Sequence, residues 1–167
     1  MRALMLLRHG KSDWGDGADD FTRPLAKRGH AAAKRMGAWM RQHRIMPDYV
    51  ISSPAVRARE TAVIVCEALQ GDAAPVVFED RLYLADLDDL LSVAGECPQQ
   101  ARNVMLVGHN PGLEDLLTYL CGEDLPVSAN GKLLPTATLA QIGLSRGWRD
   151  LKRRAGHLIA ITRPKEL

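Results

Sequence analysis

The amino-acid sequence predicts an α/β fold: a three-layer α/β/α domain around a central, mostly parallel sheet of about six strands. Short aliphatic runs of strand length alternate with longer segments whose apolar residues recur at helical spacing. The short runs are rich in branched side chains, as in strands that are buried on both faces. No tract is long enough to act as a linker, so we expect residues 1–167 to form one domain.

The strands are predicted from the short aliphatic runs. Six segments have this character: residues 3–7, 49–52, 76–78, 104–107, 136–143 and 158–162. Residues 122–134 are rich in Gly, Pro, Asn and Ser and are expected to form a loop.

The helices are predicted from the spacing of apolar residues. A set at i, i+4, i+7 and i+8 predicts a helix over residues 25–43. Similar spacing predicts a second helix from about Pro54 and a shorter one over residues 87–94. The segment NPGLEDLLTYL predicts a fourth, with Asn110 as its cap and Pro111 in its first turn.

The composition excludes several classes of protein. Hydrophobic residues make up 46% of the chain and the net charge is only +2, which fits a folded domain and gives no argument for nucleic-acid binding. No apolar run approaches the roughly 20 residues of a membrane span. Arg8 interrupts the first apolar segment, so the chain lacks a signal-peptide layout and we expect a cytoplasmic protein. Cys66, Cys97 and Cys121 have unrelated spacings, which predicts no disulfide framework.

Three of the predicted strands end in short turns that carry arginine or histidine. The run LMLL leads into Arg8 and His9, YVIS leads towards Arg57, and VMLV leads into Gly108 and His109. Ligands of open α/β sheets bind outside the carboxyl ends of the strands, and helix N-termini there favour anions. We therefore expect these arginines and histidines to meet in one anion-binding pocket.

A phosphoryl group is the anion that suits this pocket best. Adjacent buried cations repel one another unless a counter-charge is present, and the arginine fork matches phosphate oxygens. The arginines would also disfavour a charged His9 ring and keep it neutral near pH 7. A neutral imidazole nitrogen is a competent nucleophile, provided that the other nitrogen has a fixed acceptor such as a backbone carbonyl.

Four motifs resemble those of a known family, the histidine phosphatase superfamily, which includes the cofactor-dependent phosphoglycerate mutases. LLRHGKS resembles its Arg-His-Gly signature, and SSPAVRARETA resembles its second motif, with Arg57 as the phosphate-binding arginine. VGHNPG is similar to the third motif, which supplies His109, and RPLAKRG resembles a Pro-Leu-x-x-x-Gly stretch. The similarity covers nearly the whole chain. The small size, together with RHGKSDW, DRLY and GHNPGLEDL, is most similar to the SixA-type phosphohistidine phosphatases.

The resemblance implies a phosphoglycerate mutase-like fold and a covalent mechanism. His9 would attack phosphorus and form a phosphohistidine intermediate, which water then hydrolyses. In the stretch EDRLY, Asp80 stands where larger relatives carry the acid that protonates the leaving group. The resemblance implies neither a metal nor an organic cofactor. The groups that would hold the phosphoryl oxygens are Arg8, Gly10, Arg57 and His109.

Three functions remain open at this point. The first is hydrolysis of phosphohistidine in a protein, because the chain has no room for the insertions that cap the sites of larger relatives. The second is hydrolysis of a small phosphomonoester, and the third is phosphate recognition without catalysis. The expected partner is thus a histidine-phosphorylated protein or a small phosphoester, with no nucleic acid and no membrane. The basic residues 152–154 either dock an acidic partner or form a solvated turn.

Overall fold

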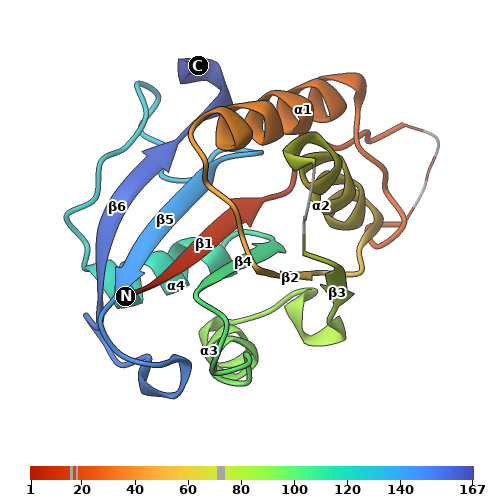
Figure 1. Ribbon diagram of the computed structural model, residues 1–167. Helices are drawn as coiled ribbons and strands as arrows, with labels where there is room; N and C mark the ends of the chain where they lie inside the picture. The colour runs from red at the N-terminus through yellow and green to blue at the C-terminus, as the bar shows by residue number, and fades with distance from the viewer. Residues whose placement is uncertain (16, 18, 71–73) are drawn as a thin grey trace.

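A six-stranded sheet runs through the middle of the computed structural model, which describes residues 1–15, 17, 19–70 and 74–167 (Figure 1). The other five positions of the predicted domain lie outside the described residues. The strand order is β3-β2-β4-β1-β5-β6. The strands are β1 (Arg2–Arg8), β2 (Tyr49–Ser52), β3 (Val76–Phe78), β4 (Asn103–Gly108), β5 (Leu139–Leu144) and β6 (Gly156–Thr162).

The sheet is mostly parallel, as predicted. Strands β3, β2, β4 and β1 run parallel, whereas β5 lies antiparallel to β1 and to β6. In the register of the sheet, Arg8 lies opposite Gly108, and Ser52 lies opposite Val107. The carboxyl ends of β1, β2 and β4 therefore meet at one edge, where the three predicted turns follow.

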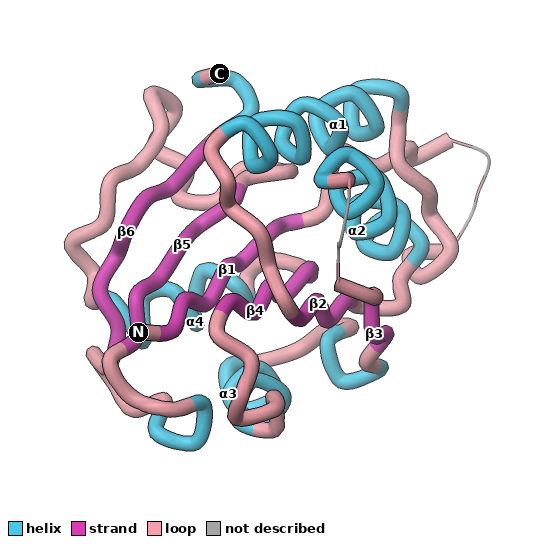
Figure 2. The backbone as a smooth tube through the Cα atoms, in the orientation of Figure 1, coloured by secondary structure: helices cyan, strands magenta, loops and turns pink. Residues whose placement is uncertain are grey.

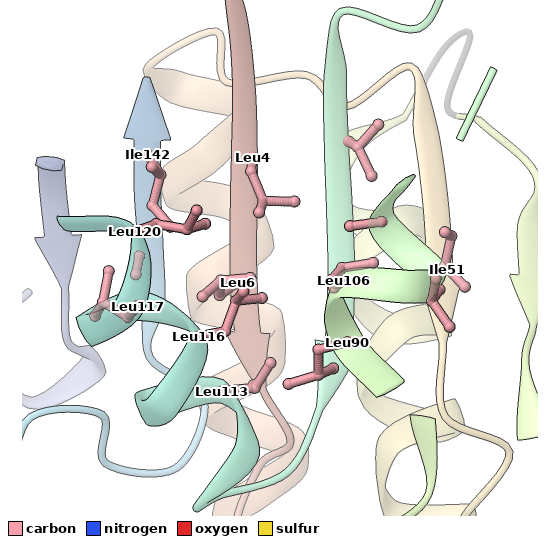
Figure 3. Close-up of a cluster of buried hydrophobic side chains, with 14 of the residues drawn as sticks. Leu4, Leu6, Ile51, Leu90, Leu106, Leu113, Leu116, Leu117, Leu120 and Ile142 are labelled. Carbon is pink, nitrogen blue, oxygen red and sulfur yellow. The ribbon is translucent and has the colours of Figure 1, made fainter. Parts of the chain in front are cut away.

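In the described part of the chain, four α-helices cover the two faces of the sheet, α1 (Lys27–Gln42) and α2 (Val56–Leu69) on one face and α3 (Leu87–Gly95) and α4 (Gly112–Cys121) on the other (Figure 2). Because side chains alternate along a strand, Met5 and Leu7 of β1 pack on the side of α1 and α2. Leu4 and Leu6 pack on the other side with the leucines of α3 and α4 (Figure 3). The fold is thus the predicted three-layer α/β/α sandwich.

Two local expectations were wrong. Strand β5 begins at Leu139 instead of residue 136, because Ala137 adopts a left-handed φ of 59° and its N–H is directed to the carbonyls of Arg8 and His9. Asn110 does not cap α4; its amide nitrogen donates instead to Glu114 and to a backbone carbonyl. Within the described ranges, none of the helices combines the length and the apolar character that a membrane crossing requires.

The start of α1 packs directly on the turn that carries His9. The Lys11 carbonyl accepts a hydrogen bond from Ala26 N–H, at 2.8 Å. A Cβ at Gly10 would lie 2.9 Å from the Gly29 carbonyl oxygen, and a Cβ at Gly29 would collide with the backbone of Lys11. Both positions therefore require glycine because two backbones touch.

Gly29→Ala should lower the free energy of unfolding by about 1–3 kcal/mol, because the collision is with backbone and cannot be relieved by a rotamer change. Urea denaturation measures the change. Gly95→Ala is the matched control, since its new Cβ would meet only Trp148 O at 3.7 Å. Equal stability of the two variants would contradict this account of the helix–turn contact.

Candidate active site

A cavity of about 640 Å³ opens outside the carboxyl ends of β1, β2 and β4. The structure brings four of the predicted residues together there: Arg8, His9, Arg57 and His109 all line the cavity. The ring centroids of His9 and His109 are 5.2 Å apart. Distant parts of the chain thus form one pocket.

His9 is held as a neutral imidazole with one defined tautomer. Its Nδ1 lies 2.7 Å from the carbonyl oxygen of Gly10. Because a carbonyl oxygen can only accept a hydrogen bond, Nδ1 carries the ring proton and donates it. Burial is the largest of the causes that together lower the pKa of His9 to about 3; the hydrogen bond to the Gly10 carbonyl opposes the shift, and the charges of Arg57 and Arg8 add to it. Burial is therefore a larger cause of neutrality than the arginines, to which the sequence analysis assigned it. Among the described residues no hydrogen bond reaches Nε2, so its lone pair is available to a ligand.

The turn after β1 is fixed by Thr61 of α2. Gly10 N–H donates to Thr61 Oγ1 at 3.0 Å, and the Thr61 hydroxyl donates to the Arg57 carbonyl at 2.7 Å. The Gly10 N–H is therefore engaged by Thr61, so its geometry adds no support to the expectation that Gly10 binds a phosphate. Its role in the structure is close packing against Gly29.

Arg57 lies in the first turn of α2 and is buried. Its guanidinium donates to the backbone carbonyl of Asp20 and, at 3.1 Å, to the Asp20 carboxylate. The same carboxylate accepts from Tyr83 OH, and its other oxygen forms an ion pair with the Arg23 guanidinium at 3.0 Å. The hydrogen bond from Tyr83 is the largest cause that lowers the pKa of Asp20 to about 2, followed by Arg57. The sequence analysis missed Asp20, which belongs to no motif.

Arg23 adds a third guanidinium to the cavity wall. It is buried, donates through Nε to Ser12 Oγ at 2.9 Å, and lies 3.5 Å from the centroid of the Trp14 ring. Trp14 is 74% exposed and lines the rim of the cavity, whereas Trp148 is fully buried in the core.

Arg8 is anchored to the loop that follows α4. It donates to the Leu134 carbonyl at 3.0 Å. Glu114 Oε2 in turn accepts from Leu134 N–H and from the Asn110 side-chain amide, each at 3.0 Å. Burial lowers the pKa of Arg8, and the negative charge of Glu114 partly opposes that shift. Glu114 is thus a second residue of the site that sequence reasoning missed.

His109 is oriented by Ser53. Its Nε2 lies 2.8 Å from Ser53 Oγ, and its Nδ1 lies 3.4 Å from an Arg57 nitrogen. Burial, followed by the charge of Arg57, lowers the pKa of His109 to about 4. Both histidines of the pocket are therefore neutral at pH 7.

Asp80 lies away from this group. It is exposed at the start of a short 3-10 helix, Asp80–Leu82, and is not among the described residues that line the cavity. Leu82 is buried and Arg81 pairs with Glu79, which fixes the turn with Asp80 towards solvent. The structure therefore does not support Asp80 as the acid; the carboxylate that contacts the predicted site is Asp20.

Neither the Cys97 thiol nor the basic residues 152–154 are among the described residues that line the cavity. Burial raises the pKa of the Cys97 thiol to about 12, which does not suit a nucleophile. The basic residues Lys152, Arg153 and Arg154 are exposed on the β5–β6 connection. Leu144, just before this connection, pairs with Arg2, so the connection lies at the end of the sheet opposite the cavity.

Comparison with known proteins identifies the family. Residues 4–90 match the histidine phosphatase superfamily (branch 1). An uncharacterized protein of Mycobacterium tuberculosis is 30% identical over 163 residues, which cover 95% of this chain and all of that protein. The chain therefore belongs to the histidine phosphatase superfamily, and the fold and site describe a phosphatase.

Within the superfamily the chain is of the SixA type. It superposes with a TM-score of 0.83 on a protein of Agrobacterium tumefaciens provisionally assigned as the phosphohistidine phosphatase SixA, at 32% identity over 98% of both chains. A similarly assigned protein of Nakamurella multipartita gives 0.81 at 27% identity, over 98% of this chain and 96% of that one. The protein histidine phosphatase SixA in complex with tungstate also gives 0.81, over 98% of both chains; at 20% identity it shows the fold alone.

The two buried histidines make stability depend on pH. Their folded pKa values of about 3 and about 4 lie below the unfolded value, near 6.5, so the unfolded chain binds protons first as the pH falls. Stability should be fully present above pH 6.5 and decrease towards pH 4, by at most about 1.4 kcal/mol per pH unit for each histidine. Urea denaturation at several pH values measures this slope. His109→Asn should make it shallower, and an unchanged slope would contradict the burial of a neutral His109.

Proposed function

We propose that this phosphatase hydrolyses phosphohistidine on a protein, through a covalent phosphohistidine intermediate on His9. One observation carries the proposal: His9 presents an unbonded Nε2 in a cavity lined by Arg8 and Arg57, while Gly10 O holds its Nδ1–H. This arrangement supplies a nucleophile and cationic donors for a phosphoryl group in the same place.

In the first step the Nε2 lone pair attacks phosphorus. A bond forms between Nε2 and phosphorus as the bond to the leaving group breaks, and that electron pair stays with the leaving group. Arg8 and Arg57 stabilise the charge on the equatorial oxygens. The Gly10 carbonyl keeps the proton on Nδ1, so His9 carries the phosphoryl group as a protonated ring and needs no separate base.

In the second step water attacks the phosphoryl group. The bond between phosphorus and Nε2 breaks, and its electron pair returns to Nε2. His9 is thereby restored as the neutral tautomer with its proton on Nδ1, and the protons of the water leave with the phosphate. The hydrogen bond to Gly10 O thus serves both halves of the cycle.

His109 helps to orient the arginine of the pocket. An Arg57 nitrogen lies 3.4 Å from His109 Nδ1, and because a guanidinium has no acceptor, Nδ1 accepts this hydrogen bond. The ring proton is then on Nε2 and is donated to Ser53 Oγ at 2.8 Å; that oxygen also accepts from Ala55 N–H at 3.2 Å. In this tautomer His109 holds Arg57 towards a phosphoryl oxygen bound at His9.

The rim of the cavity supports a substrate carried on a protein surface. Trp14 and Leu84 line the cavity and are 74% and 75% exposed, so apolar side chains stand around the entrance. The SixA-type structures that resemble this chain are assigned to phosphohistidine. The absence of Asp80 from the described cavity wall fits this substrate, because a protonated imidazole leaves more readily than an alkoxide and depends less on an acid.

A small phosphomonoester is the second candidate substrate, since a cavity of about 640 Å³ would hold one. Values of kcat/KM for a histidine-phosphorylated protein and a panel of small phosphoesters separate the two functions. We expect the protein to be preferred. A preference for a sugar phosphate by orders of magnitude would refute the proposed substrate.

His9→Ala should lower turnover by at least about 1,000-fold, because the nucleophile is lost while the arginines remain. Rapid quenching of the wild type with an aryl phosphate should trap an acid-labile, base-stable phosphoryl group on His9. His43→Ala, at an exposed histidine just after α1, is the control and should react normally. A phosphoryl group found on serine or cysteine would overturn the mechanism.

Glu114→Ala should lower kcat/KM by about 10- to 100-fold, because it releases the Leu134 segment that orients Arg8. Glu114→Gln keeps an acceptor oxygen and should retain most activity. In an Arg8→Ala background, Glu114→Ala should cause little further loss, since both changes act through one guanidinium. Asp88→Asn, in the first turn of α3, is the control. Additive losses would show that Glu114 does not act through Arg8.

A further inference from the structure

Cleavage of phosphohistidine by His9 passes a phosphoryl group from one imidazole to another. Each ring leaves as a neutral group only if its remote nitrogen carries a proton, because a ring without that proton would leave as an anion. For His9 this proton is held on Nδ1 by the Gly10 carbonyl. The inference below rests on the proposed function, and it concerns the group that holds the corresponding proton of the substrate.

Three carboxylates line the described part of the cavity: Asp20, Asp86 and Asp115. Asp86 is engaged as the cap of α3, where it accepts from Asp89 N–H at 2.9 Å. Asp115 is exposed on α4. Among the described residues, no hydrogen bond or ion pair joins it to Arg8, Arg57 or His109. Asp20 alone of the three is bonded to Arg57. Asp20 is therefore the carboxylate next to Arg57, the guanidinium that we propose binds the phosphoryl oxygens.

We propose that Asp20 is the specificity-determining residue for a phosphorylated imidazole, because its carboxylate accepts the remote N–H of the leaving ring. The carboxylate has room for this bond. It accepts hydrogen bonds from Tyr83 and Arg57 and forms an ion pair with Arg23, whereas its two oxygens offer about four acceptor positions. Its side chain is 46% exposed, so the remaining position is open to a ligand.

The position of Asp20 is fixed relative to Arg57. The Asp20 backbone carbonyl also accepts from Arg57, so main chain and side chain are both tied to one guanidinium. Tyr83, which donates to the carboxylate, packs edge-on against Phe21 with 5.0 Å between the ring centroids. A carboxylate held in this way is oriented before the substrate arrives.

The charge of Asp20 selects between kinds of leaving group. As the bond between His9 Nε2 and phosphorus forms, the P–N bond of the substrate breaks and its electron pair stays on the ring nitrogen. The remote N–H stays on the ring, neutral imidazole leaves, and Asp20 gains no proton. A carboxylate stabilises the cationic ring that precedes this step, but it repels the negative charge that develops on an alkoxide or aryloxide.

The test compares two substrates on each enzyme preparation: phosphoimidazole and 4-nitrophenyl phosphate. Asp20→Asn should lower the ratio of their kcat/KM values by about tenfold or more, the effect of losing one charge-assisted hydrogen bond. Hydrolysis of the aryl phosphate should fall by a smaller factor, because it loses only the contribution of Asp20 to the orientation of Arg57. The ratio does not depend on the fraction of folded enzyme. Asp19→Asn is the matched control, because Asp19 bonds to Thr22 and is not among the described lining residues.

The pH profile gives a second readout. In Asp20→Asn the alkaline limb of the pH profile of kcat for phosphoimidazole should move to lower pH. The reason is that the pKa of the substrate ring falls when the neighbouring negative charge is removed. The pH profile for the aryl phosphate should not move. Equal losses on both substrates would mean that Asp20 only positions Arg57, and would overturn this inference alone. A wild type that hydrolyses the aryl phosphate but not phosphoimidazole would refute the proposed function itself, and this role of Asp20 with it.

Discussion

The hydrogen bond between His9 Nδ1 and the Gly10 carbonyl is the contact on which the chemistry of this site depends. A buried imidazole has two neutral tautomers, and only one of them leaves Nε2 able to attack. The acceptor belongs to the adjacent residue, so the bond keeps its geometry only if the turn is rigid. Thr61 holds the turn from α2, and Gly29 supports it from α1. The helices of one face thus set the protonation state of His9.

The cations of the site are oriented by internal acceptors in the same manner. Arg8 points to the Leu134 carbonyl, and Arg57 is bonded to both the backbone and the side chain of Asp20. These acceptors offset the cost of burying a guanidinium and reduce the reorganisation needed when an anion binds. The negative groups of the site, Asp20 and Glu114, therefore belong to the same hydrogen-bond network as the arginines.

The sequence predicted that Arg8, His9, Arg57 and His109 meet in one pocket because these residues lie close to strand ends. Arg8 is the last residue of β1, and His109 follows β4 directly, so hydrophobic patterning places both of them without tertiary information. Asp20 and Glu114 could not be found in this way. Asp20 lies in an irregular segment, and Glu114 has the appearance of an ordinary acidic residue in the first turn of a helix. Asp80 was misplaced because a motif fixes position along the chain but not the direction in which a 3-10 turn presents a side chain.

The central position of β1 has a consequence for how the chain acquires this structure. Leu7 pairs with Val107 on one side and with Leu139 on the other, so both neighbours of the first strand are contributed from the distant second half of the chain. Such non-local pairings close long loops and slow the search for the native topology. During synthesis β1 is made before either of its neighbours in the sheet. The edges of β1, the strand that leads into His9, therefore stay open to wrong partners until residues 103–108 and 139–144 are available to pair.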